Sequence, residues 1–155
     1  MGNMILKGHD LFKSLNVDER QALSEISSVK EFKKGEIIFK YKQAVSHFYI
    51  LMSGEVYLQL PADHPEFNLP VSKVEKGELF GLSPLLKSPR YTLTAQCFKA
   101  TKALAVEAKP FREMLRSDSN AGLDILNQVA HIYFMRYLDL IKRLHSVVGQ
   151  VTLKH

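Results

Sequence analysis

Six histidines and one cysteine are the residues of this 155-residue sequence that metal or thiol chemistry would use. Cys97 lies in a segment with strand character, which favours a small buried hydrophobic residue over a nucleophile. A lone cysteine also excludes an intramolecular disulfide and a cysteine-based zinc cluster. The histidines are scattered and include no His-x-His pair: His9, His47, His64, His131, His145 and His155. We therefore expect no metal site.

Sequence motifs of the common enzyme classes are also absent. The chain contains no Gly-x-Ser-x-Gly motif, no Walker-type loop and no Ser, His and Asp residues in the order of a catalytic triad. It is therefore not expected to be an enzyme, which leaves ligand binding or protein interaction as the functions to consider.

The charge balance of the chain is mildly basic. Lys and Arg number 21 against 16 Asp and Glu, which gives a formal net charge of +5. A basic excess meets one loose criterion for nucleic-acid binding, although a solvated basic surface is also common. The chain is 46% hydrophobic and 24% charged, as folded globular domains are. No apolar run approaches the roughly 20 residues of a membrane span, and we expect a cytoplasmic protein.

The first two thirds of the chain predict one helix followed by strands. Asn16 and Glu19 have the spacing of a capping box, which indicates a helix that ends near Ser27–Ser28. Short β-branched and aromatic runs such as Ile37–Phe39 then repeat between glycine turns, which predicts about seven strands. Short strands at regular spacing are typical of an antiparallel sandwich or barrel.

The last third of the chain predicts two helices. Pro110 fits the first turn of a helix, a position that proline tolerates. Apolar residues at steps of three and four then predict a longer helix from about Ser119 to Leu144. Helices segregated at the ends of an antiparallel sheet make the fold class α+β.

Several turn segments carry a resemblance to a known family. They are an opening Leu11–Phe12 pair, Gly35 before Ile37–Phe39, the run Tyr49–Val56, and Lys76–Gly81. In this order they resemble the cyclic-nucleotide-binding domain superfamily of catabolite activators, regulatory subunits of protein kinase A and cyclic-nucleotide-gated channels. The resemblance covers about Leu11 to Leu144. It implies an antiparallel β-roll, jelly-roll-like and cupin-like, at about 29–107, with an N-terminal helix and C-terminal helices at about 110–145, in one domain spanning 1–155.

The resemblance also implies a ligand-binding cassette, here residues 80–92. Its candidate ligand-binding residues are Phe80, Gly81, Leu82, Ser83, Arg90, Tyr91 and Thr92. In the family, a Glu after Phe-Gly holds the ribose hydroxyl, and an Arg nine residues later pairs with the cyclic phosphate. This sequence has Leu82 at the first position and, aligned without a gap, Tyr91 at the second. A one-residue deletion in the loop would instead bring Arg90 into the arginine position.

These two departures bear on the ligand. A charged hydrogen bond is worth roughly 1.5–3 kcal/mol, so losing two would weaken binding by about two to four decades. We expect weak or no binding of ordinary cyclic AMP or cyclic GMP. Two alternatives stay open: the pocket binds another small anion, with Arg90 turned inward, or Tyr91 and Leu82 fill a pocket that no longer works.

The long C-terminal helix has two possible uses. In the transcription-factor branch of the family, the equivalent helix forms a dimer seam, and a homodimer is a prediction here as well. Its seam would consist of Leu126, Val129, Tyr133, Tyr137 and Leu140. The alternative is that this stripe docks on the β-roll. About ten residues follow Leu144, too few for a winged helix-turn-helix, so we expect no specific DNA binding.

The sequence therefore predicts a stand-alone regulatory or sensory domain. A small anionic ligand, a cyclic nucleotide among the candidates, would change the pose of the C-terminal helices and so present a surface to a protein partner. The main alternative is a ligand-free protein-interaction module on the same fold. An enzyme of cupin-like shape is a third possibility, which the missing metal ligands disfavour.

Overall fold

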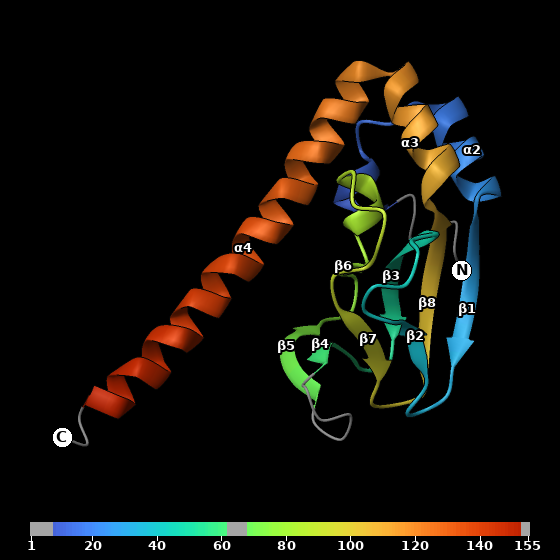
Figure 1. The fold of residues 1–155 in the computed structure, drawn as a ribbon. Helices are drawn as coiled ribbons and strands as arrows, with labels where there is room; N and C mark the ends of the chain where they lie inside the picture. The colour runs from blue at the N-terminus through green and yellow to red at the C-terminus, as the bar shows by residue number, and fades with distance from the viewer. Residues whose placement is uncertain (1–7, 62–67, 153–155) are drawn as a thin grey trace.

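The fold consists of two β-sheets with helices at both ends of the chain (Figure 1). It is seen in a computed structural model that describes residues 8–61 and 68–152. The strands are β1 (Ser27–Phe32), β2 (Ile37–Phe39), β3 (His47–Ser53), β4 (Val56–Pro61), β5 (Asn68–Val74), β6 (Leu79–Phe80), β7 (Thr94–Cys97) and β8 (Thr101–Glu107). The helices are η1 (Asp10–Phe12), α2 (Val17–Glu25), η2 (Ser83–Leu85), α3 (Ala108–Ser117) and α4 (Ser119–Thr152).

Two four-stranded antiparallel sheets form the β-roll. One has the strand order β1-β8-β3-β6 and the other β2-β7-β4-β5. Residues distant in sequence are paired across them, such as Tyr49 with Ala105 and Tyr57 with Gln96. The α+β class and the antiparallel β-roll expected from the sequence are confirmed, with eight strands in the described residues where about seven were predicted.

The N-terminal helix begins as predicted and ends earlier. Asn16 Oδ1 accepts from the Glu19 amide at 2.9 Å, and Glu19 Oε2 accepts from the Asn16 amide at 2.8 Å, which completes the capping box. The helix ends at Glu25 because the next residues pair with β8, Ser27 opposite Val106. The predicted end near Ser27–Ser28 is therefore wrong by about two residues.

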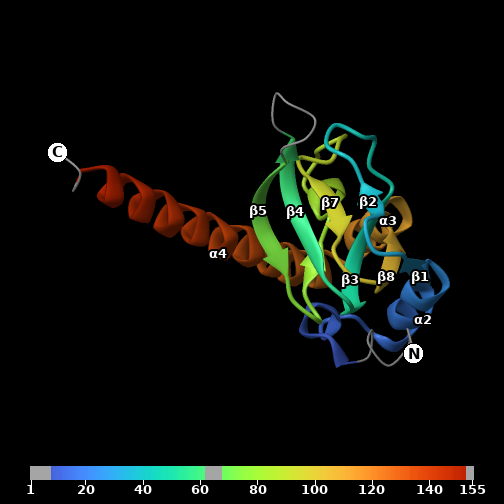
Figure 2. The same ribbon diagram turned by 90° about the horizontal axis from the view of Figure 1, so that it is seen from below.

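Helix α4 is longer than predicted and leaves the roll. It runs to Thr152 and not to about Leu144. Its first turns bury Ala121, Ile125 and Val129 against η1 and α3. Beyond them the helix extends away from the body of the fold, on the side where β5 lies (Figures 1 and 2). Residues of the second half of α4 and of the β4–β5 hairpin line a common cavity.

The core has two parts. One lies inside the roll and contains a cluster of stacked rings from Phe39, Tyr49, Phe80 and Tyr91. The other lies between the first sheet and the helices, where Phe111 of α3 is fully buried. The cluster inside the roll packs against the cassette, and the cluster between the first sheet and the helices packs against the first turns of α4.

Candidate ligand pocket

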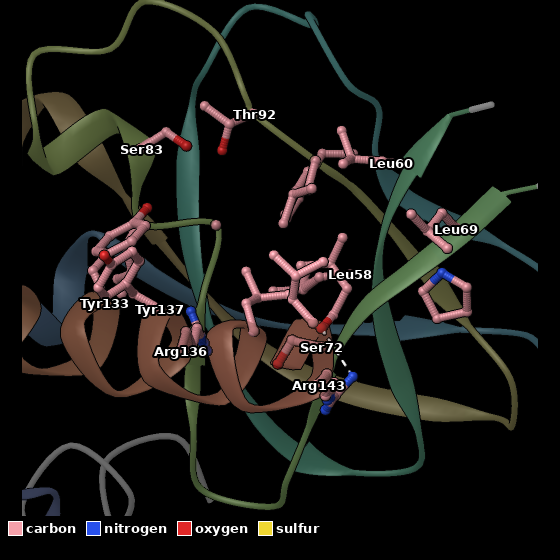
Figure 3. Close-up of a pocket in the computed structure, with 18 of the residues that line it drawn as sticks. Leu58, Leu60, Leu69, Ser72, Ser83, Thr92, Tyr133, Arg136, Tyr137 and Arg143 are labelled. Atoms are coloured by element: carbon pink, nitrogen blue, oxygen red, sulfur yellow. Dashed lines mark hydrogen bonds between the residues drawn. The ribbon is translucent and has the colours of Figure 1, made fainter. Parts of the chain in front are cut away.

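A cavity of about 700 Å³ separates α4 from the roll. Strands β4 and β5 and cassette residues form one wall, and the face of α4 between Tyr133 and Val147 forms the other (Figure 3). This volume lies within the range of small-molecule sites. The lining residues are Phe39, Leu58, Leu60, Leu69, Pro70, Val71, Ser72, Gly81, Leu82, Ser83, Thr92, Leu93, Tyr133, Arg136, Tyr137, Leu140, Arg143, Leu144 and Val147.

Four of the predicted cassette residues line this cavity: Gly81, Leu82, Ser83 and Thr92. Gly81 has φ +67, and a Cβ there would come within 2.8 Å of the Phe39 ring. Only glycine fits this close approach, which sets the cassette against the ring cluster. Leu82 adds an apolar surface where the family pattern has a carboxylate.

Three predicted residues lie outside the lining. Phe80 is fully buried and stacks on Tyr49, with ring centroids 5.3 Å apart. Arg90 is exposed and directs Nη1 to the Lys42 carbonyl oxygen at 2.8 Å. It therefore does not turn inward, and it adds no charge to the cavity wall.

Tyr91 is the third of these residues and sits beneath the cavity. Its ring stacks on Phe39 at 4.0 Å and is 2% exposed. Its hydroxyl donates to the His47 carbonyl at 2.6 Å and accepts from the His47 amide at 3.2 Å. Tyr91 thus fills the interior of the roll and leaves the cavity open.

Two arginines of α4, which the sequence analysis did not single out, reach the cavity. Arg136 donates from Nη2 to the Leu79 carbonyl, and Arg143 donates from Nη1 to the Val71 carbonyl at 3.2 Å. Their spacing of seven residues places them on one face of a helix, a signal that the sequence carried. No Asp or Glu is among the described residues that line the cavity.

The two arginines differ in their charge partners. Arg143 Nη2 pairs with Asp139 at 2.7 Å. Within residues 8–61 and 68–152, Arg136 has no carboxylate at ion-pair distance. Burial lowers the pKa of Arg136, and the charge of Glu78 opposes that shift. The Arg136 guanidinium is therefore a half-buried cation that interacts with Glu78 at longer range and makes no ion pair among the described residues.

Tyr133 of α4 lies near the cassette. Burial raises the pKa of Tyr133, and the nearby Ser83 side chain acts in the opposite direction. The hydrogen bond from Arg136 to the Leu79 carbonyl ties the middle of α4 to β6, just before the cassette. A molecule that enters the cavity lies beside Tyr133, Ser83 and Arg136.

The stripe predicted as a dimer seam is divided between the core and the surface. Val129 is fully buried and Tyr133 is half-buried, as expected if the stripe docks on the roll. Leu126, Tyr137 and Leu140 are 40%, 57% and 40% exposed, and the last two line the cavity. Val129 therefore cannot contribute to a seam, and the homodimer itself stays a prediction.

The remaining candidate residues are Cys97 and the histidines. Burial raises the pKa of the Cys97 thiol, which keeps it protonated and unreactive. The described residues contain no cluster of three or more potential metal ligands; His64 and His155 lie outside them. No helix in the described part of the chain has the length and apolar character of a membrane span.

Comparison with known families and proteins matches residues 29–118, more than half of the chain, to the family described as cyclic nucleotide-binding domain. A cGMP-dependent protein kinase from Eimeria tenella is 31% identical over 108 residues, which are 69% of this chain and 10% of the kinase. The chain therefore spans about a tenth of the length of this curated relative.

Solved structures share the fold. A putative cyclic nucleotide-binding protein from Geobacter metallireducens has a TM-score of 0.75 and 26% identity, covering 88% of this chain and 98% of that one. The sensor domain of the transcriptional regulator DNR from Pseudomonas aeruginosa has a TM-score of 0.72 and 21% identity, with 83% and 91% covered. The regulatory domain of Toxoplasma gondii PKA, crystallised with cAMP, has a TM-score of 0.68 and 22% identity, with 86% and 49% covered.

Proposed function

We propose that this chain, which belongs to the cyclic nucleotide-binding domain family, is a regulatory sensor whose ligand binds between the β-roll and α4. The observation that carries the proposal is the cavity itself, because one wall is the cassette side of the roll and the other is α4 between Tyr133 and Val147. A ligand that contacts both walls changes the pose of α4. The moved helix then presents a different surface to a protein partner. This role needs no catalytic residue.

An open cavity favours this sensor role over a ligand-free interaction module. In the alternative, Tyr91 and Leu82 would fill the pocket from within. Both residues are buried, with Tyr91 2% and Leu82 1% exposed, but the cavity between the roll and α4 remains open beside them. The expected result is that a small molecule copurifies with the protein or raises its Tm in a screen of organic anions.

Ordinary cyclic nucleotides are not the proposed ligand. Leu82 offers no acceptor for a ribose hydroxyl, and Arg90 is held at the surface by Lys42. We expect isothermal titration with cAMP and with cGMP to show no low-micromolar binding. The regulatory domain of Toxoplasma gondii PKA, which was crystallised with cAMP, serves as the positive control. Low-micromolar binding of either nucleotide to this chain would contradict the prediction.

A homodimer through α4 is the proposed assembly. Phe134, Leu138 and Ile141 are spaced by four and three residues, the spacing of a coiled-coil seam, and none of them lines the cavity. Phe134 and Ile141 are 55% and 43% exposed, so this face is uncovered in the single chain. A second copy of α4 is therefore the partner that fits.

The dimer predicts a sharp effect of one added charge. Ile141→Glu places a carboxylate in the seam and is expected to give a monomer, measured by light scattering after gel filtration. Ser146→Glu adds the same charge at an exposed position off the seam and is expected to stay dimeric. A monomeric parent protein, or a dimeric Ile141→Glu variant, would rule out this seam.

A further inference from the structure

The cavity beside α4 is mostly apolar and has polar groups on two sides. Ser83, Tyr133 and Arg136 gather on one side, and Leu58, Leu60 and Leu69 lie toward the other, together with Ser72 and the ion-paired Arg143 (Figure 3). Such a division suits a molecule with a charged head and an apolar body. The cavity offers few polar partners for the hydroxyls of a ribose and the edges of a base.

The shape of the cavity is elongated. Its α4 wall extends from Tyr133 to Val147, which is roughly 21 Å along a helix axis. Three of the seven α4 side chains that line the cavity are aliphatic, namely Leu140, Leu144 and Val147, and Leu58, Leu60 and Leu69 of the β4–β5 hairpin line it as well. A flexible alkyl chain matches a long aliphatic groove better than a compact ring system does.

The charge on the side of Ser83 and Tyr133 selects an anion. Arg143 is already paired with Asp139, whereas Arg136 has no carboxylate at ion-pair distance among the described residues and interacts with Glu78 only at longer range. A guanidinium carries five N–H donors, and the Leu79 carbonyl accepts from one nitrogen of Arg136 only. The remaining donors match the two oxygens of a carboxylate, which guanidinium groups bind in bidentate fashion.

We propose that the pocket binds an amphipathic organic anion, namely a long-chain aliphatic carboxylate. Its carboxylate pairs with Arg136, and its alkyl chain lies between β5 and the second half of α4. This inference rests on the proposed sensor function, because it names the ligand of the same pocket. Bound there, the alkyl chain completes the apolar surface that α4 and the hairpin leave open.

Isothermal titration with dodecanoate and with dodecan-1-ol tests the head and the chain separately. Dodecanoate is expected to bind saturably at one site per chain, below its aggregation concentration. The alcohol has the same chain without the charge, so it is expected to bind about tenfold or more weakly. Equal affinities for acid and alcohol, or no saturable binding of the acid, would overturn the proposal.

A pair of matched variants tests the location. Leu140 lines the cavity and is 40% exposed, while Leu86 lies outside its lining and is 43% exposed. Leu140→Glu puts a carboxylate beside the anion's path and is expected to weaken dodecanoate binding at least about tenfold. Leu86→Glu adds the same charge elsewhere and is expected to leave the affinity unchanged. An unaffected Leu140→Glu variant would overturn the assignment of the site.

Mass spectrometry of small molecules extracted from the purified protein separates the two levels of the proposal. An acyl carboxylate in the extract supports the ligand class. If a different small molecule raises the Tm of the ligand-free protein and dodecanoate does not, the proposed ligand class is wrong. The proposed sensor function then still holds. An empty extract with no Tm shift from dodecanoate or from the anion screen overturns both.

Discussion

Gly54→Ala is expected to lower the free energy of unfolding by about 4 kcal/mol, a large fraction of the stability of a small domain. Gly54 joins β3 to β4 with φ +100, a conformation that side chains with a Cβ rarely adopt. An added Cβ would lie 2.4 Å from Thr101 Oγ1 and 2.5 Å from the Ala100 carbonyl oxygen. Because the second contact is to backbone, β8 must shift to relieve it. Urea denaturation of both proteins gives the difference.

Gly77→Ala is the matched control for this prediction. Gly77 also has a positive φ, +86, but no atom lies within 4 Å of an added Cβ. Its replacement therefore costs only the backbone strain, about 1–2 kcal/mol. The difference between the two variants measures the close approach of the β3–β4 turn to β8. If both variants lose the same stability, this steric argument is wrong.

Phe111→Ala is expected to cost about 3–5 kcal/mol, the usual range for a buried phenylalanine. The Phe111 ring is fully buried and meets Phe48 at 5.0 Å and Phe12 at 6.1 Å between ring centroids. It therefore joins α3 to β3 and to η1 at the base of α4. We expect faster hydrogen exchange in the first turns of α4 as well as lower stability.

Phe98→Ala tests the same substitution at a site with less packing. Phe98 is 41% exposed and its ring contacts Tyr57 edge to face at 4.8 Å. An exposed aromatic pair is worth about 0.5–1.5 kcal/mol, so the loss should be several times smaller than that of Phe111→Ala. Exchange in α4 should stay unchanged. If both variants lost the same free energy of unfolding, the packing of Phe111 would contribute no more to stability than that of Phe98.

Features set by local sequence were the predictable part of the fold. The capping box of α2 depends on two side chains three residues apart, and the turn glycines Gly35 and Gly77 adopt the positive φ that only glycine accepts readily. The end of α4 was not predictable in this way. Beyond Leu144 the valines Val147, Val148 and Val151 continue the apolar spacing, no proline follows, and Gly149 lowers helix stability by only about 1 kcal/mol.

The candidate pocket was predictable on its cassette side only. Gly81 and Ser83 belong to a continuous motif, whereas the α4 and β5 walls come from residues far away in the chain. The placement of Arg90 and Tyr91 follows from their being neighbours in an extended segment, where successive side chains point to opposite sides. The Tyr91 side chain lies in the interior of the roll, and the Arg90 side chain lies at the surface beside Lys42.

The length of α4 turns small rotations into large displacements. The helix has 34 residues, or roughly 51 Å at 1.5 Å per residue. Its core contacts end near Tyr133, and beyond that point Arg136 and Arg143 each donate a hydrogen bond to a strand. From Tyr133 to Thr152 the helix is roughly 29 Å long, so a tilt of about 10° there would carry the far end through roughly 5 Å. The helix therefore acts as a lever. A small displacement near its core contacts becomes a larger displacement at its far end, which a protein partner can recognise.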